Sequence, residues 1–261
     1  MKVITIRNLS YAYDDSSVLK GIDISLEKGM FYSILGPNGS GKTTLLKNIQ
    51  KILKPHRNSV YINGDDITSI SVKELSKQLA VVPQETHMDF DFTVLDMVLM
   101  GRSPHLKRFE SESPKDLHLA EKVMTDTDTW KFKDKSVRNI SGGELQRAVV
   151  SRAMVQDTEI LLLDEPVSHL DIHHQISILR TVSGFSKSKG ITVVAVLHDI
   201  NLAVEFSDSV ILLNQGVVEA MGSPEEVITK ERIRSLYSME CMIIKNPTSG
   251  KPHVIPTEIS K

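Results

Sequence analysis

The chain has 261 residues, of which 40% are hydrophobic and 25% charged, as in a globular protein with a sizeable core. Its 31 basic and 33 acidic residues are mixed along the chain and leave a net charge of −2, which disfavours a nucleic-acid-binding protein. The one cysteine, Cys241, excludes an intrachain disulfide and fits a reducing cytoplasm. We expect no signal peptide and no membrane span, because apolar runs such as 160–163 and 193–197 are only as long as strands. Any membrane role therefore depends on a partner.

Short apolar strands alternate with helical patterns, which predicts an α/β fold with a largely parallel sheet. The first segments differ, because 3–6 and 18–26 alternate apolar and polar residues on either side of an Asp-Asp-Ser-Ser turn and so predict antiparallel strands. Asn63-Gly64 indicates a hairpin after the strand 58–62. The other elements expected in this part are a buried strand, a helix and a short strand, at 31–35, 42–53 and 80–82.

Strand patterns are absent from about 85 to 156, where helices are expected at 94–100, 115–124 and 144–155. We interpret 85–156 as a helical subdomain inserted between the halves 1–84 and 157–240 of an α/β core. The second half is expected to hold four strands and two helices, the last helix with Ser223 as its N-cap: 160–163, 172–186, 191–197, 210–213, 217–220 and 224–237. The tail, 241–261, carries three prolines and is expected to be extended from 245 onward.

The segment GPNGSGKTT fits the pattern G-x-x-x-x-G-K-[ST] and lies between an expected strand and an expected helix. Its glycines let the backbone turn tightly and point successive amides at phosphates, and the helix start adds the positive end of the peptide dipoles. Lys42 is expected to reach the β- and γ-phosphates, and the Thr43 hydroxyl to bind magnesium. The alternative, a glycine-rich turn that binds nothing, is disfavoured by this setting. The expected ATP-binding residues here are Gly36, Pro37, Asn38, Gly39, Ser40, Gly41, Lys42, Thr43 and Thr44.

A buried strand ending in two carboxylates, ILLLDE at 160–165, supplies the acidic partner that such a loop needs. We expect Asp164 to hold magnesium and Glu165 to polarise an attacking water. The alternative is a buried strand with solvated acids at its exit, which is common for an isolated pair of acids.

Two tyrosines upstream of the loop, Tyr11 and Tyr13, could stack on a base. Stacking tolerates any base, so it supports a purine nucleotide and selects adenine only weakly, but the chain also lacks the Asn-Lys-x-Asp guanine reader. We expect Tyr13 to bind ATP, while at least one of the two tyrosines packs along the sheet.

Together these motifs resemble the nucleotide-binding subunit of an ABC transporter, over nearly the whole chain. The resemblance rests on six motifs in the family's order: Walker A GPNGSGKT (36–43), the Q-loop glutamine in VVPQE (81–85), the signature ISGGE (140–144), Walker B LLLDE (161–165), the D-loop SHLD (168–171) and the switch histidine in VLHD (196–199). Ile140 and Glu144 depart from the commoner LSGGQ. The resemblance implies a RecA-like P-loop NTPase core with an N-terminal antiparallel β subdomain and an inserted α-helical subdomain, and ATP and Mg²⁺ as cofactors.

The resemblance also implies roles for residues outside the loop. Gln84 would bridge magnesium or the attacking water and couple it to the helical insertion, and His198 would contact the γ-phosphate and hold that water near Glu165. Asp171 would act in a dimer contact. Four signature residues would cap the γ-phosphate held by a second subunit, or, in the alternative, form only an N-cap and a turn: Ser141, Gly142, Gly143 and Glu144.

A metal site is a rival interpretation of SHLDIHH at 168–174. His169, Asp171, His173 and His174 are dense enough for zinc, and the first and third are spaced for one helix face. No distant ligand set accompanies them, so we favour the dimer contact for Asp171 and a solvated helix start for the histidines.

The segments 94–105, 164–175 and 246–256 resemble those of importers for metal chelates: ferric siderophores, haem or cobalamin, with molybdate-type oxyanions close by. Val167 stands where threonine is frequent. The implied partners are a second copy of the chain, integral-membrane permeases and, indirectly, an extracytoplasmic substrate-binding protein, with no nucleic acid. The chain would lie at the cytoplasmic face of the membrane.

Two alternatives are an exporter cassette and a soluble ABC ATPase that acts on nucleic acid. The single cassette, the near-neutral charge and the short stretch between the Q-loop and the signature disfavour the second.

Overall fold

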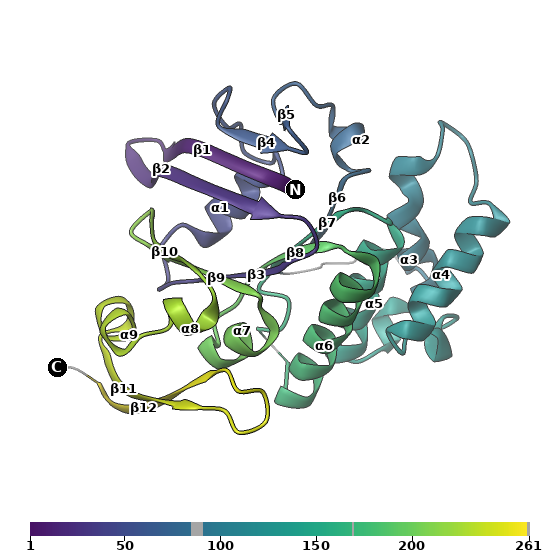
Figure 1. The fold of residues 1–261 in the computed structure, drawn as a ribbon. Coiled ribbons are helices and arrows are strands. Elements are labelled where there is room, and N and C mark those ends of the chain that lie inside the picture. Colours follow the sequence, from purple (N-terminus) through teal and green to yellow (C-terminus); the bar gives the residue numbers. More distant parts are fainter. Residues whose placement is uncertain (85–90, 169, 260–261) are drawn as a thin grey trace.

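The computed structural model describes residues 1–84, 91–168 and 170–259, the side chains of 258 and 259 excepted. Two sheets lie one above the other, and helices flank them (Figure 1). The upper sheet is antiparallel in the order β2-β1-β4-β5, with strands Lys2–Tyr13 (β1), Ser16–Glu27 (β2), Val60–Ile62 (β4) and Asp65–Asp66 (β5). The expected antiparallel start and the Asn63-Gly64 hairpin are confirmed.

The second sheet has six strands in the order β10-β9-β3-β8-β7-β6, of which only β10 runs antiparallel to its neighbour. Its strands are Phe31–Leu35 (β3), Leu79–Val82 (β6), Ile160–Asp164 (β7), Thr192–Val196 (β8), Ser209–Asn214 (β9) and Val217–Gly222 (β10). The largely parallel sheet is thus confirmed. The strands β3, β7 and β8 are buried on both faces, and their sequences are accordingly largely apolar, with Ser33, Asp164 and Thr192 as buried polar exceptions.

Each face of this sheet covers its own core. One face carries Tyr32, Leu162 and Val194, which pack with helix α1 (Lys42–Ile49) against the antiparallel sheet. The other face carries Phe31 and Leu163, which pack against helices that follow β6 in the chain. Alternation along each strand therefore joins the two layers into one domain.

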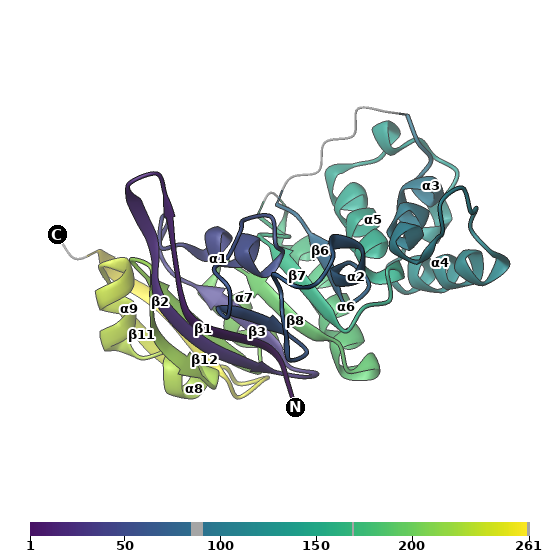
Figure 2. The ribbon, with the colours of Figure 1, turned by 90° about the horizontal axis from the view of Figure 1, so that it is seen from above.

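Between β6 and β7 the described elements are all helical: α3 (Val94–Leu99), η1 (Met100–His105), α4 (Pro114–Asp126), η2 (Trp130–Phe132), η3 (Val137–Asn139) and α5 (Gly142–Val155). Figure 2 shows them set to one side of both sheets. Helix α2 (Val72–Leu75) precedes β6, and α6 (Ile172–Lys189) and α7 (Ile200–Phe206) follow β7 and β8.

Two expectations about single helices are wrong. The helix expected at 42–53 ends at Ile49, since Lys51 is left-handed with φ 60°. The helix expected at 224–237 is two helices, α8 (Pro224–Val227, capped by Ser223 as expected) and α9 (Lys230–Tyr237), because Thr229 is extended and caps a new start. The tail is extended as expected over β12 (Pro252–Ile259), but it also pairs with β11 (Met239–Lys245) in an antiparallel hairpin whose Cys241 and Val254 are buried.

Candidate functional site

The phosphate loop, residues 36–43, joins the buried strand β3 to α1. Gly36 has φ 156°, and a Cβ built there would lie 2.0 Å from the carbonyl oxygen of Leu213 at the end of β9. Gly41 has φ 103°, and a Cβ there would lie 2.8 Å from Leu19 Cδ2. No L side chain fits either position, so the loop's conformation and its close packing both require glycine.

Lys42 is buried inside this loop, where its Nζ donates to the carbonyls of Gly36 (2.8 Å) and Pro37 (2.9 Å). Burial lowers the pKa of Lys42, and the carboxylates of Glu165 and Asp164 oppose that shift. Ser40 Oγ is also buried and has no hydrogen-bond partner among the described residues. The loop therefore holds a cation and an unsatisfied hydroxyl, as expected of an anion site.

A cavity of about 370 Å³ opens over the loop. It is lined by Val18, Asn38, Gly39, Gly41, Lys42, Thr43, Thr44 and Glu165. Tyr13 is not among these; it lies at the end of β1, 42% exposed, with its ring edge-on to Tyr11 at 5.1 Å. Its stacking on a base stays a prediction. Val18 lines the cavity instead, and no sequence signal distinguishes it from other apolar strand residues.

Asp164 ends β7 beside the start of α1, and its Oδ1 accepts from the Thr43 hydroxyl at 3.3 Å. Burial raises the pKa of Asp164, and the hydrogen bond from Thr43 opposes the shift. A carboxylate and a hydroxyl from separate segments thus face each other at the mouth of the loop. Such oxygen donors fit a hard cation such as Mg²⁺.

Glu165 lies where three separate segments meet. Its Oε1 is 2.6 Å from His198 Nε2, and its Oε2 accepts from Gln84 Nε2 at 2.8 Å. Its backbone is left-handed, φ 49°, which costs a non-glycine residue about 1–3 kcal/mol. The three residues follow β6, β7 and β8, adjacent parallel strands, so sheet topology alone brings them together.

Tyr237, from α9, also contacts the loop and was missed by sequence reasoning. Its hydroxyl hydrogen-bonds the backbone of Gly36, and burial raises the pKa of Tyr237 to about 12. The C-terminal part of the chain therefore supports the first residue of the phosphate loop.

The signature segment, residues 140–144, starts α5. Ser141 is the N-cap: its Oγ accepts from the Glu144 amide (3.3 Å), while Glu144 Oε2 accepts from the Ser141 amide (2.8 Å) and hydroxyl (3.0 Å). These bonds from Ser141 lower the pKa of Glu144. None of the described residues lining the phosphate-loop cavity comes from this segment.

Asp171 caps α6, with Oδ1 accepting from the His174 amide (3.0 Å) and Oδ2 lying 2.7 Å from His174 Nδ1. Ligand atoms of Asp171, His173 and His174 lie within 4.8 Å of one another, whereas His169 lies outside the described residues. Zinc bound here would have to displace Asp171 from Nδ1, and Nε2 lies against Gly143. The cluster is better explained by its internal contacts.

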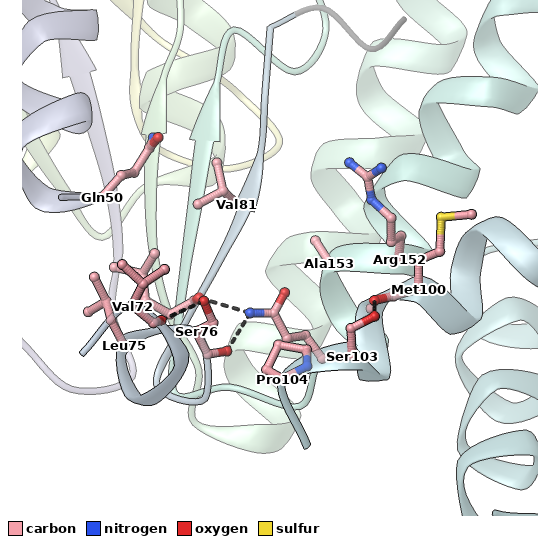
Figure 3. Close-up of a pocket in the computed structure, with 13 residues that line it drawn as sticks. Gln50, Val72, Leu75, Ser76, Val81, Met100, Ser103, Pro104, Arg152 and Ala153 are labelled. Carbon is pink, nitrogen blue, oxygen red and sulfur yellow. Dashed lines mark hydrogen bonds between the residues drawn. The ribbon is translucent and has the colours of Figure 1, made fainter. Parts of the chain in front are cut away.

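A groove of about 400 Å³ separates α2 and β6 from the helical region. Figure 3 shows Val72 and Leu75 on one side and Met100 and Pro104 on the other. Val72 is 70% exposed at the edge of this groove. No helix among the described residues is long and apolar enough to cross a bilayer.

A family model described as ABC transporter matches residues 19–168. The chain belongs to the ABC transporter family. It is 36% identical over 248 residues to the ferric enterobactin transport ATP-binding protein FepC of Escherichia coli (strain K12), covering 95% of this chain and 92% of FepC. It is 32% identical over 261 residues to the iron(3+)-hydroxamate import ATP-binding protein FhuC of Bacillus subtilis (strain 168), covering 100% and 97%.

Solved structures agree. An inward-facing ABC transporter described as of metal-chelate type superimposes with a TM-score of 0.85 at 26% identity, covering 98% of this chain and 97% of that one. A dimeric ATP-binding cassette, MJ0796, bound to ADP and Pi, gives 0.73 at 28% identity and covers 84% and 98%. The expected ABC ATPase fold is confirmed, and this ABC transporter subunit binds ATP and couples its hydrolysis to transport.

Proposed function

We propose that this chain is the ATP-hydrolysing subunit of an importer for a metal chelate: a ferric siderophore, haem or cobalamin, or a molybdate-type oxyanion. The arrangement around Glu165 carries the proposal, because it places a carboxylate, a histidine and a glutamine beside a phosphate loop. The names of the relatives, a ferric enterobactin transporter and a ferric hydroxamate importer, favour import of iron chelates over export and over action on nucleic acid.

In this proposal Glu165 is the general base. It accepts a proton from a water molecule as the water oxygen bonds to the γ-phosphorus and the bond to the bridging β–γ oxygen breaks, leaving ADP and phosphate. His198 and Gln84 each hold one carboxylate oxygen, so the base is oriented before the substrate binds. A carboxylate oxygen has a second lone pair, which stays available for the water proton.

The phosphate loop binds the reacting phosphates. Lys42 exchanges the carbonyls of Gly36 and Pro37 for β- and γ-phosphate oxygens, and the loop amides surround them. Mg²⁺ would be held by the Thr43 hydroxyl, the Asp164 carboxylate and the Gln84 side-chain oxygen, and would neutralise charge on the phosphates.

The signature segment acts in trans. Family subunits of this kind work as dimers with membrane permeases, and MJ0796 has been solved as a dimer. The exposed start of α5 offers a hydroxyl and amides that do not line the chain's own cavity. We infer that Ser141, Gly142 and Gly143 cap the γ-phosphate bound to the partner subunit, with Asp171 in the same contact, so that ATP closes the dimer and hydrolysis reopens it.

The groove between α2 and η1 is where we place the permease. It presents exposed Val72 beside Leu75 and Met100. It lies between the sheet region, with α2 and β6, and the helical region, with η1 and α5, and Gln84 follows β6 at the junction of these regions in the chain. The subunit would thus sit peripherally at the cytoplasmic face of the membrane, with a substrate-binding protein acting from the opposite side.

Reconstitution tests the proposal. The chain would be co-purified with its permease in lipid nanodiscs, and phosphate release measured with and without chelate-loaded binding protein. We expect ATPase activity that rises with a loaded iron-chelate binding protein and is lost on Ser141→Trp, while that variant still binds ATP as an isolated chain. Turnover of Ser141→Trp equal to that of the wild type would contradict the role in trans.

A further inference from the structure

The imidazole of His174 lies directly against the main chain of Gly143 in the first turn of α5. A Cβ built on Gly143 would be 2.7 Å from His174 Cδ2 and 3.0 Å from Nε2, so the ring leaves no room for any side chain. A Cβ built on the preceding Gly142 would have none of the surrounding atoms within 4 Å. Contact with the histidine therefore falls on one of the two signature glycines only.

The opposite edge of the same ring is held by the D-loop. Asp171 Oδ2 lies 2.7 Å from Nδ1, which places the ring proton on Nδ1 and leaves Nε2 directed to Gly143 when the imidazole is neutral. Asp171 also caps α6 through the His174 amide at 3.0 Å. The side chain of His174 thus connects the start of α6 with the start of α5, two helix starts that are far apart in the sequence.

Gln175 holds two described residues that precede Asp171 in the chain. Its Nε2 donates to the carbonyls of Val167 (3.2 Å) and Leu170 (2.9 Å), and Val167 is buried. This segment follows Glu165 directly. Gln175 therefore connects the start of α6 with the segment that follows Glu165. His174 connects the same helix start with α5.

We propose that His174 is a positioning residue that sets the signature segment against Asp171. Residues 141–143 and Asp171 of one subunit then form a single surface that contacts the partner subunit. The inference rests on the proposed function of the signature segment in trans. Hydrogen bonds from amides to a phosphate require placement within about 0.5 Å. A helix start that shifts relative to the D-loop cannot satisfy both contacts with the partner at once.

His173 provides a matched control. It is exposed, and its ring meets that of His174 edge-on at 5.4 Å. Replacing it removes an imidazole from the same helix turn without touching the contacts to Gly143 and Asp171.

The test uses the full chain carrying Glu165→Gln, with two measurements: ATP affinity of the isolated chain by titration, and ATP-driven dimerisation by sedimentation velocity. Adding His174→Ala is expected to weaken dimerisation at least tenfold, with ATP affinity and melting temperature within error of the parent. Adding His173→Ala is expected to change neither. Dimerisation of the His174→Ala chain equal to the parent's overturns the inference and leaves the proposed function intact. A parent that does not dimerise with ATP overturns both.

A second variant keeps the test sharp if His174→Ala does not fold. Gly143→Ala with His174 intact is expected to weaken dimerisation to a similar degree, because the added methyl collides with the ring. The double variant is expected to dimerise no worse than His174→Ala alone, since the collision is gone. Two single effects that simply multiply would show that Gly143 and His174 act separately, against the proposal.

Discussion

The Glu144 carboxylate accepts hydrogen bonds from both donors of Ser141, from its amide at 2.8 Å and from its hydroxyl at 3.0 Å. These are the groups that we assign to the γ-phosphate of the partner subunit. A negative charge therefore lies where another negative charge is expected to bind, and the phosphate must compete with it. Glutamate in place of the commoner glutamine is a departure with a physical consequence.

Glu144→Gln should make ATP-driven dimerisation tighter. The amide oxygen still accepts from Ser141 and so keeps the cap, but the charge is gone. Repulsion between two unit charges about 5 Å apart is of order 1–3 kcal/mol at the effective dielectric of a protein surface, which corresponds to about 5- to 150-fold in the dimer dissociation constant. Sedimentation of the Glu165→Gln chain with and without this change measures it. Weaker dimerisation would mean that the carboxylate itself contacts the nucleotide.

Glu165→Gln should preserve the site's geometry and remove its base. The new side chain has the same shape and still accepts from Gln84, but it cannot take the proton of a water molecule. We expect kcat to fall by about 10²–10⁴-fold while ATP binding persists, so that an ATP-bound dimer accumulates. Size-exclusion chromatography with ATP and a phosphate-release assay measure both effects. A chain that stays monomeric with ATP would contradict the dimer proposal.

Lys42→Ala should abolish tight nucleotide binding. Charge-assisted hydrogen bonds to phosphate contribute about 1.5–3 kcal/mol each, so ATP affinity should fall by about a hundredfold. The loop carbonyls of Gly36 and Pro37 also lose their donor, and a small drop in thermal stability is expected with it. Calorimetric titration with ATP is the measurement, and the exposed Lys20 of β2 offers a control for loss of a positive charge. An unchanged affinity for ATP would contradict the assignment of residues 36–43 as the loop that binds the phosphates.

Asp116→Ala should destabilise the helical region. Asp116 accepts from Ser113 at the start of α4 and from Arg102 at 2.7 Å, and both partners of this ion pair are largely buried. Removing it leaves the largely buried charge of Arg102 without its carboxylate and with only the carbonyls of Val155 and Gln156 as partners, at a cost of about 3 kcal/mol. Denaturant unfolding measures this, with Asp126→Ala, exposed on the same helix, as the control.

The same carboxylate predicts a pH dependence. The hydrogen bond from the Ser113 hydroxyl, followed by the other bonds from Ser113 and Arg102, lowers the pKa of Asp116 from 3.8 to about 2. Because the folded-state pKa is depressed, its stabilisation is complete above about pH 4 and is lost as the pH falls toward 2. Wild type and Asp116→Ala should therefore converge in stability over that interval. Parallel stability curves down to pH 2 would contradict this.

Much of the site could be predicted because its chemistry is local. The phosphate loop needs a strand, three glycines, a lysine and a helix start within a few residues of one another, and Gly36 and Gly41 occupy positions that accept nothing larger. The paired acids at 164–165 end a strand that is buried on both faces, which an uninterrupted apolar run identifies. Such signals depend on neighbouring residues only, so the sequence contains them in full.

Elsewhere the local pattern was insufficient. Residues 224–237 have a continuous helical pattern, yet the burial of Ile228 and the cap at Thr229 divide the helix. In the hairpin, β11 packs beside α9, which directly precedes it, whereas β12 contacts α7, where the Asn201 side chain donates to the carbonyl of Val254 (3.1 Å) and accepts from its amide (2.8 Å). The periodicity of a segment does not encode what it packs against, so these choices belong to tertiary contacts.

The sequence by itself determined the family, the phosphate loop and the identity of the catalytic candidates, because each depends on residue types at fixed spacing. The tertiary structure decided how these candidates meet. Gln84, Glu165 and His198 converge because β6, β7 and β8 are adjacent and parallel, an order that no single segment specifies. The contact of His174 with Gly143 likewise exists only because two helix starts pack together, and packing is a property of surfaces that fold onto one another.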